Sequence, residues 1–182
     1  MVDEFVSQLA AELTQRNYQV TQSLMTLECK GLLLATSKKM VHIGPVKFKN
    51  HYLFVDWDNE LFGRLDMLLD AQKNFSAMVN KDYKVPHGWR MTLPNLALVA
   101  LTTNGFSNET IECTLSRYFS PILGGEAAQI MLFDLRQNWM IAHSPPYYKQ
   151  YGRIPLESAV NEISDMFSVI VPGGTIFRKK PA

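Results

Sequence analysis

A buried strand, a long amphipathic helix and a second buried strand follow one another in the middle of the chain. Residues 51–57 are aromatic, β-branched and almost continuously apolar, as expected for a central strand covered on both faces. Apolar side chains then recur at helical spacing from 61 to 79, and residues 96–101 form a second continuous apolar run. Because a strand–helix–strand unit joins parallel strands, this segment predicts an α/β protein with a sheet that is at least partly parallel.

The segments before this unit also alternate between helix and strand. Residues 3–16 carry apolar side chains on one face at helical spacing, which predicts an amphipathic helix. From Tyr18 to Cys29 apolar and polar residues alternate with a period of two, and Leu32 to Ala35 form a short apolar run. Two short strands, paired as a hairpin or a bent ribbon, are therefore expected between the first helix and the central strand.

After the second buried strand, the pattern of helix and strand repeats. Residues 102–109, TTNGFSNE, predict a turn into a helix with Ser107 or Asn108 as its cap. Another apolar strand follows over 129–135, and Pro155 opens a last helix. The complete order predicts a three-layer α/β fold, in which a mixed β-sheet carries helices on both faces.

Composition indicates one domain of ordinary character. The 182 residues, 47% hydrophobic and 19% charged, suit a single domain with a sizeable core. We assign residues 1–172 to this single α/β domain and residues 173–182, GGTIFRKKPA, to a basic, loosely held C-terminal tail. The formal net charge of +1 excludes an overall strongly basic nucleic-acid binder, although a local basic patch can still bind.

The sequence lacks the features of an exported or membrane protein. Its N-terminal residues are acidic and amphipathic, unlike a signal peptide, and no window of about eighteen apolar residues exists, so no membrane span is expected. Cys29 and Cys113 lie in apolar surroundings, which indicates reduced, buried thiols in a cytoplasmic protein. No cysteine–histidine cluster has zinc spacing, and no Ser-His-Asp or Cys-His nucleophile pattern can be argued.

Two acids one residue apart end the central strand, in FVDWDNE. If the strand continues through Trp57, Asp56 and Asp58 lie on the same face, where two carboxylates would suit a Mg²⁺ ion. The other interpretation is a strand end that runs into a helix, with Asp58 or Asn59 capping a helix that starts near Glu60.

Charge is distributed unevenly along the chain before this acid pair. The residues from Cys29 to Val55 include no acid, but they include five lysines and two histidines: Lys30, Lys38, Lys39, Lys47, Lys49, His42 and His51. A basic hairpin of this kind could follow the phosphates of a nucleic acid through the Lys30–Lys49 stretch. Alternatively, it is a solvated ribbon whose lysines protect a sheet edge from aggregation.

The order of elements, together with three local motifs, resembles the restriction-endonuclease-like fold. An N-terminal helix ends in RNYQV, a hairpin leads to HYLFVDWD, and a helix and an apolar strand lead to TTNGFSNE. Over residues 3–120 this arrangement is similar to the domain of type IV, methyl-directed restriction enzymes. The resemblance implies that fold and, where the catalytic residues are present, divalent-metal-dependent cleavage of nucleic acid.

The catalytic motif of that family is matched only in part. There, an acid on the hairpin and an acid on the central strand bind the metal, and a lysine two residues after the second acid assists the attacking water. Carried over, these positions place the acids at Glu28 and Asp56, but Asp58 stands where the lysine belongs. In LECKG, Glu28 and Lys30 form the acid-x-lysine pattern, yet no acid lies on the strand before them.

Three hypotheses follow. Because the motif is incomplete, the first is a non-catalytic binding or scaffold protein without a cofactor, acting as a homodimer or with a protein partner that the tyrosine-rich loop PPYYKQYGR contacts. The second is a Mg²⁺-dependent nuclease that uses Glu28, Asp56 and Asp58, with Lys30 or Lys73 replacing the lysine. The third is an α/β domain that binds a small anion at the Gly105 turn, residues 104–108.

Overall fold

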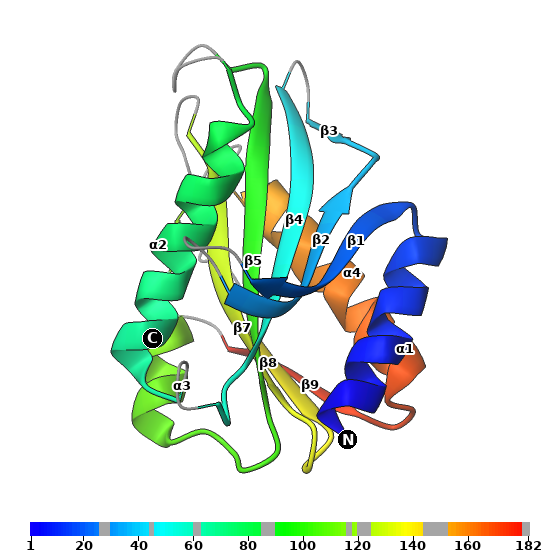
Figure 1. Ribbon diagram of the computed structural model, residues 1–182, viewed down its shortest axis with the longest axis vertical. Helices are drawn as coiled ribbons and strands as arrows, with labels where there is room; N and C mark the ends of the chain where they lie inside the picture. The colour runs from blue at the N-terminus through cyan, green and yellow to red at the C-terminus, as the bar shows by residue number, and fades with distance from the viewer. Residues whose placement is uncertain are drawn as a thin grey trace.

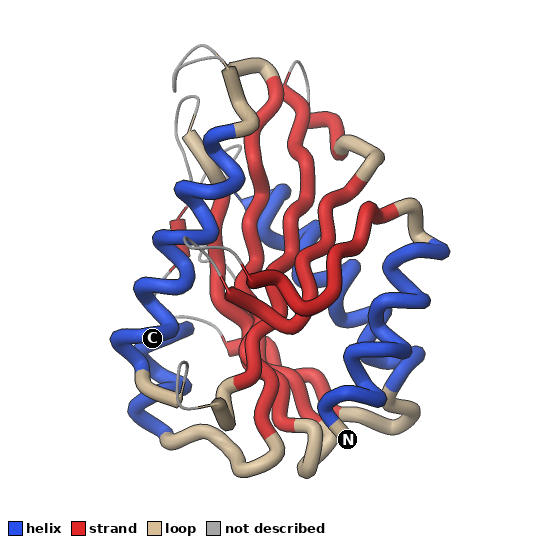
Figure 2. Tube along the Cα trace, viewed as in Figure 1, coloured by secondary structure: helices blue, strands red, loops and turns tan. Residues whose placement is uncertain are grey.

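A β-sheet between two layers of helices makes up the fold of the computed structural model (Figures 1 and 2). The structure describes residues 1–25, 30–43, 46–59, 63–84, 90–115, 118–119, 125–143 and 153–179. The elements in chain order are α1 (Val2–Gln15), β1 (Tyr18–Met25), β2 (Lys30–Ser37), β3 (Val41–Ile43), β4 (Val46–Asp56), α2 (Leu65–Lys81), β5 (Thr92–Thr102), α3 (Asn108–Leu115), β6 (Tyr118–Phe119), β7 (Ala127–Asp134), β8 (Trp139–His143), α4 (Arg153–Ile170) and β9 (Thr175–Lys179).

The strands form one mixed sheet with the main order β1-β2-β4-β5-β7-β8-β9, while β3 pairs with β4 and β6 with β7. β2 is antiparallel to both β1 and β4, whereas β4, β5 and β7 are parallel neighbours. β8 then runs antiparallel to β7, and β9 runs parallel to β8. The parallel strands are joined through helices, as crossover connections require. The prediction of an α/β protein with a mixed sheet is therefore confirmed.

Each face of the sheet has its own hydrophobic core. On one face, α1 and α4 pack with side chains such as Leu13 and Phe167 against Tyr52 and Phe54 of β4. On the other face, Phe75 of α2 packs against the alternate residues of β4 and β5, and α3 lies on the same side (Figure 1). Successive residues of a strand point to opposite faces, so β4 and β5 contribute to both cores and are almost continuously apolar.

The structure corrects the expected start of the second helix. α2 begins at Leu65 rather than near Glu60, and the residue before it is Arg64 in an extended conformation, which makes no side-chain cap hydrogen bond. Asp58 and Asn59 therefore do not cap α2. For α3, in contrast, Ser107 accepts a hydrogen bond from the amide of Thr110 at 3.1 Å and caps the helix as predicted.

The tail expected from residue 173 is in part a strand. Thr175–Lys179 form β9, which pairs with β8 at the edge of the sheet. Gly173, with a φ of 80°, allows the chain to turn back after α4, and a side chain at Gly174 would lie 2.6 Å from the ring of Phe167. Strand β3 was also not expected, because Val41–Ile43 is too short to show a period.

Several sequence predictions lie on residues that the structure does not describe, namely Glu28, Cys29 and most of the loop PPYYKQYGR. Cys113 is half-buried in α3, so its thiol is less enclosed than predicted. None of the helices in the described ranges combines the length and the apolar character that a membrane span requires.

Candidate functional site

Asp58 ties the end of β4 to the end of β5. Its carboxylate accepts hydrogen bonds from the Thr102 hydroxyl at 2.6 Å, the Thr103 amide at 2.6 Å and the Thr103 hydroxyl at 2.7 Å. Burial alone would raise the pKa of Asp58, but these hydrogen bonds hold it below its usual value. Asp58 therefore acts as a clamp between two neighbouring parallel strands, a role that the sequence interpretations of this residue did not include.

Asp56 has fewer partners than Asp58. One of its carboxylate oxygens accepts a hydrogen bond from the Asp58 amide at 3.1 Å. Burial raises the pKa of Asp56, the hydrogen bond from Asp58 opposes this shift, and the negative charges of Asp58 and Asp3 add to it. The carboxylate of Asp56 thus lies among other acids, and its charged form is disfavoured.

The structure brings Asp56 and Asp58 together but describes only part of the predicted nuclease set. Within the described ranges, no group of three or more histidine, cysteine, aspartate or glutamate side chains could hold a metal ion. Glu28 and the side chain of Lys30 lie outside the described residues, so their place relative to Asp56 stays a prediction. Lys73 forms an ion pair with Asp70 on the exposed side of α2, at 3.1 Å.

Three amide groups at the Gly105 turn already have hydrogen-bond acceptors within the protein. The Thr103 amide donates to Asp58, and the amides of Asn104 and Gly105 donate to the Thr102 hydroxyl at 3.0 and 3.2 Å. Gly105 has a φ of 91°, which only glycine adopts readily. An anion at this turn would have to displace the internal hydrogen bonds of Asn104 and Gly105, and the small-anion hypothesis for residues 104–108 stays a prediction.

A pocket of about 440 Å³ lies beside β4, the strand that ends at Asp56. It is on the face of the sheet that α2 also covers. We call it the β4 pocket. It is lined by residues of β1, β2 and β4 and of the segments before β3, after α2 and at the start of β5: Gln19, Thr21, Leu34, Thr36, Met40, Lys49, His51, Asp82, Tyr83 and Thr92. Most of these side chains are polar, and only His51 among them is buried.

His51 links two hydroxyl groups at the base of the β4 pocket. Its side chain is only 4% exposed, with Nδ1 3.1 Å from the Thr36 hydroxyl and Nε2 3.2 Å from the Tyr83 hydroxyl. Burial, assisted by the positive charge of Lys49, lowers the pKa of His51 to about 3. The imidazole is therefore neutral near pH 7, and one of its nitrogens donates while the other accepts.

Tyr83 forms one wall of the pocket and is held from several sides. The guanidinium of Arg90 lies 5.1 Å from the centre of the Tyr83 ring, a cation–π contact. Arg90 also donates to the amide oxygen of Asn80, which fixes its position beside the ring. Burial raises the pKa of Tyr83 to about 12, against the opposing effect of Arg90, so the hydroxyl stays protonated. No sequence pattern identified Tyr83, because it follows α2 in a segment predicted to be a loop.

Of the lysines that the sequence singled out, Lys49 lines this pocket. Lys47 and Lys49 lie on the same face of β4 as His51, since side chains two residues apart share a face. Lys38 and Lys39 are exposed just after β2. The ion pairs among the described residues are Arg16–Glu12, Arg64–Asp66 and Lys73–Asp70, so none of them neutralises these four lysines.

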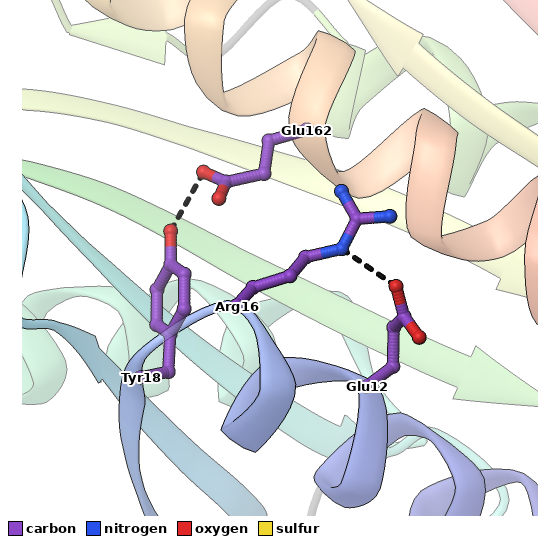
Figure 3. Close-up of polar contacts among 4 residues, drawn as sticks. All are labelled: Glu12, Arg16, Tyr18 and Glu162. Carbon is purple, nitrogen blue, oxygen red and sulfur yellow. Dashed lines mark hydrogen bonds and ion pairs between the residues drawn. The ribbon is translucent and has the colours of Figure 1, made fainter.

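A second polar cluster lies on the opposite face of the sheet and has a structural role. One carboxylate oxygen of Glu162 accepts hydrogen bonds from Tyr18 at 2.6 Å, Tyr52 at 2.7 Å and Asn50 at 2.9 Å. Figure 3 shows Tyr18, the first residue of β1, pointing to Glu162. The ion pair between Arg16 and Glu12 lies next to Tyr18. Burial, together with Glu162, raises the pKa of Tyr18. The cluster joins α4 to β1 and β4, and sequence reasoning missed it.

Comparison with protein-family models, with curated proteins and with solved structures found no match to this chain.

Proposed function

We propose that this chain is a non-catalytic binding domain with restriction-endonuclease-like topology, and that it binds the phosphates of a nucleic acid on the face that holds the β4 pocket. One observation carries this proposal. Lys47 and Lys49 lie beside a polar pocket, on a segment without any acid, and no ion pair among the described residues neutralises them. Cations without an ion-pair partner, beside other polar groups at the surface, are the arrangement that backbone phosphates bind.

The topology supports the fold part of the proposal. β1, β4, β5 and β7 share one direction and β2 runs opposite to them. An N-terminal helix, a hairpin, a central strand, a helix, a further strand and the Gly105 turn follow in the order that the resemblance implies. Since one fold can carry many functions, the binding role rests on the lysines and the pocket rather than on the topology.

The geometry at the end of β4 supports a non-catalytic role. Both oxygens of Asp58 accept hydrogen bonds from Thr102 and Thr103, so they are less available to a metal ion. Asp58 also occupies the position at which the resemblance requires a lysine. A carboxylate in that position cannot present a positive, proton-donating group to an attacking water.

The nuclease alternative has one observation in its favour, the disfavoured charge of Asp56 beside Asp58 and Asp3, which a cation would relieve. Calorimetric titration with Mg²⁺ and Mn²⁺, comparing the natural protein with Asp56→Asn, tests it. Heat that the substitution abolishes would support a metal site and would be followed by cleavage assays on several forms of DNA. Absence of heat in both proteins would contradict the nuclease.

Binding of fluorescein-labelled single-stranded DNA, duplex DNA and RNA, measured by polarisation between about 50 and 200 mM salt, tests the proposed function. The double variant Lys47→Gln/Lys49→Gln should weaken binding of all sequences and flatten the salt dependence by about one unit of slope for each phosphate that is no longer bound. The matched control, Arg136→Gln/Arg178→Gln, removes two exposed charges from the turn after β7 and from β9, away from the β4 pocket, and should bind like the natural protein. Equally weakened binding in both double variants, or no binding of any probe, would contradict the proposal.

The oligomeric state and the location in the cell stay predictions. A homodimer or protein partner was expected from PPYYKQYGR, and most of that loop lies outside the described residues. Size-exclusion chromatography with light scattering would decide between a monomer and a dimer.

A further inference from the structure

The polar side chains at the base of the β4 pocket form a chain with only one free hydroxyl proton. If Tyr83 donates to Nε2 of His51, Nδ1 donates to Thr36, and the Thr36 hydroxyl proton is free to point into the pocket. If the other tautomer is present, Thr36 donates to Nδ1 and the Tyr83 proton is free. In both states one end of the chain offers a donor to a ligand while the other end is left with acceptor capacity.

The charges on the pocket wall favour a ligand with a single phosphate group. Lys49 and the exposed Asp82 both line the pocket, without forming an ion pair with each other. The carboxylate of Asp82 would repel the additional negative charges of a polyphosphate, so the pocket suits one phosphate at Lys49. Around these groups, Gln19, Thr21 and Thr92 provide further neutral hydrogen-bonding groups.

The size and the apolar parts of the pocket suit a planar organic group next to that phosphate. A volume of about 440 Å³ lies in the usual range of small-molecule sites. Met40, 43% exposed, and the Tyr83 ring both line the pocket and offer apolar surface. Nucleobases have an apolar face and an edge on which donors and acceptors stand side by side, which complements the two ends of the Thr36–His51–Tyr83 chain.

We propose that the β4 pocket binds a single phosphorylated nucleoside, with Lys49 at the phosphate and the Thr36–His51–Tyr83 chain at the edge of the base. This inference rests on the proposed function and adds a site for one unstacked nucleotide to the lysine-lined strand face. The nucleotide belongs to a bound single strand or is a free mononucleotide, because both present the same chemical groups.

Calorimetry with each of the four 5′-mononucleotides and with inorganic phosphate tests the pocket directly. At least one mononucleotide should bind, and inorganic phosphate should bind at least about tenfold more weakly, since it cannot reach the hydroxyl chain. Thr36→Val and Tyr83→Phe remove one hydroxyl each and should each weaken mononucleotide binding about fivefold to tenfold. Because both act through His51, the double variant should lose less than the product of the two single losses.

The matched control is Ser168→Ala, which removes an exposed hydroxyl on α4, on the other face of the sheet. It should bind mononucleotides like the natural protein, and thermal melting of all variants establishes that they are folded. Failure of every mononucleotide to bind, or equal binding by the natural protein and the two hydroxyl variants, would overturn the inference.

Oligonucleotides separate this inference from the proposed function. A single strand with one abasic position should bind more weakly than its parent only if a base enters the pocket, and Tyr83→Phe should remove that difference. If oligonucleotides bind through Lys47 and Lys49 with no sensitivity to Thr36, Tyr83 or the abasic position, the proposed function stands and the inference fails. If mononucleotides bind with the expected sensitivity and no oligonucleotide binds, the ligand is the free mononucleotide and the proposed function fails.

Discussion

Protonation of His51 should destabilise the folded protein as the pH falls. The His51 side chain is 4% exposed and lies between the hydroxyls of Thr36 and Tyr83. Burial, with a smaller effect of the positive charge of Lys49, lowers the pKa of His51 to about 3. In the unfolded chain a histidine has a pKa near 6.5. Between these values the unfolded state binds a proton that the folded state does not, so stability rises with pH.

The size of this effect follows from the two pKa values. The contribution of His51 is fully present above about pH 6.5 and is lost at about 1.4 kcal/mol per pH unit below it. At pH 5 the free energy of unfolding should therefore be lower by about 2 kcal/mol than at pH 7 through this residue alone. Most aspartates and glutamates titrate below pH 5, so this interval reports mainly on histidines, and a substitution of His51 identifies its share.

Urea denaturation at pH 5, 6 and 7, followed by tryptophan fluorescence, measures the effect. His51→Gln should remove the part of the pH dependence that His51 contributes, whatever its stability at pH 7. His42→Gln is the matched control, because His42 is exposed on β3, and it should keep the pH dependence of the natural protein. The same pH dependence in His51→Gln and in the natural protein would refute the reasoning.

Four further substitutions test the polar contacts and the Gly105 turn by chemical denaturation. Glu162→Ala should lower the free energy of unfolding by about 3 kcal/mol, because it leaves three donors, two of them tyrosine hydroxyls, without their shared acceptor; a decrease below about 1 kcal/mol would contradict this. Asp58→Asn should lower the free energy of unfolding by about 1–2 kcal/mol, because it weakens the hydrogen bonds of Asp58 with Thr102 and Thr103. Asp56→Asn should leave the stability at pH 7 unchanged or raise it, since the charged form of Asp56 is disfavoured. A larger loss for Asp56→Asn than for Asp58→Asn would be inconsistent with the geometry. Gly105→Ala should cost about 1 kcal/mol because of its φ of 91°, and an unchanged stability would argue against that conformation.

The elements with long apolar patterns could be predicted from the sequence. The parallel core was identified from three features: the apolar run around Phe54, the helical spacing of Leu68 and Phe75, and the apolar strand through Val99. These patterns are strong because strands that are buried on both faces are almost continuously apolar. Ser107 was also identifiable as a cap from its place between a turn and an amphipathic segment. Short or edge elements such as β3 and β9 lack this signal and were missed.

The candidate site was harder to predict because it depends on contacts between distant segments. Lys49 and His51 stood out in a basic segment, but the sequence does not show that Tyr83, thirty-two positions after His51, completes the pocket. The clamp on Asp58 likewise depends on Thr102 and Thr103, which the parallel register of β4 and β5 brings alongside. The local sequence pattern indicates which residues are candidates for a site, whereas the pairing of distant segments decides which of these residues are in contact.

The most direct test of a ligand face on β4 is an NMR titration of the isotope-labelled protein with a short single-stranded oligonucleotide. If the proposal is correct, the amide signals that shift belong to the β4 pocket and its rim, including Thr36, Lys49, His51 and Tyr83. Shifts centred instead on the clamp of Asp58 and the Gly105 turn, or no shifts at low salt, would contradict it.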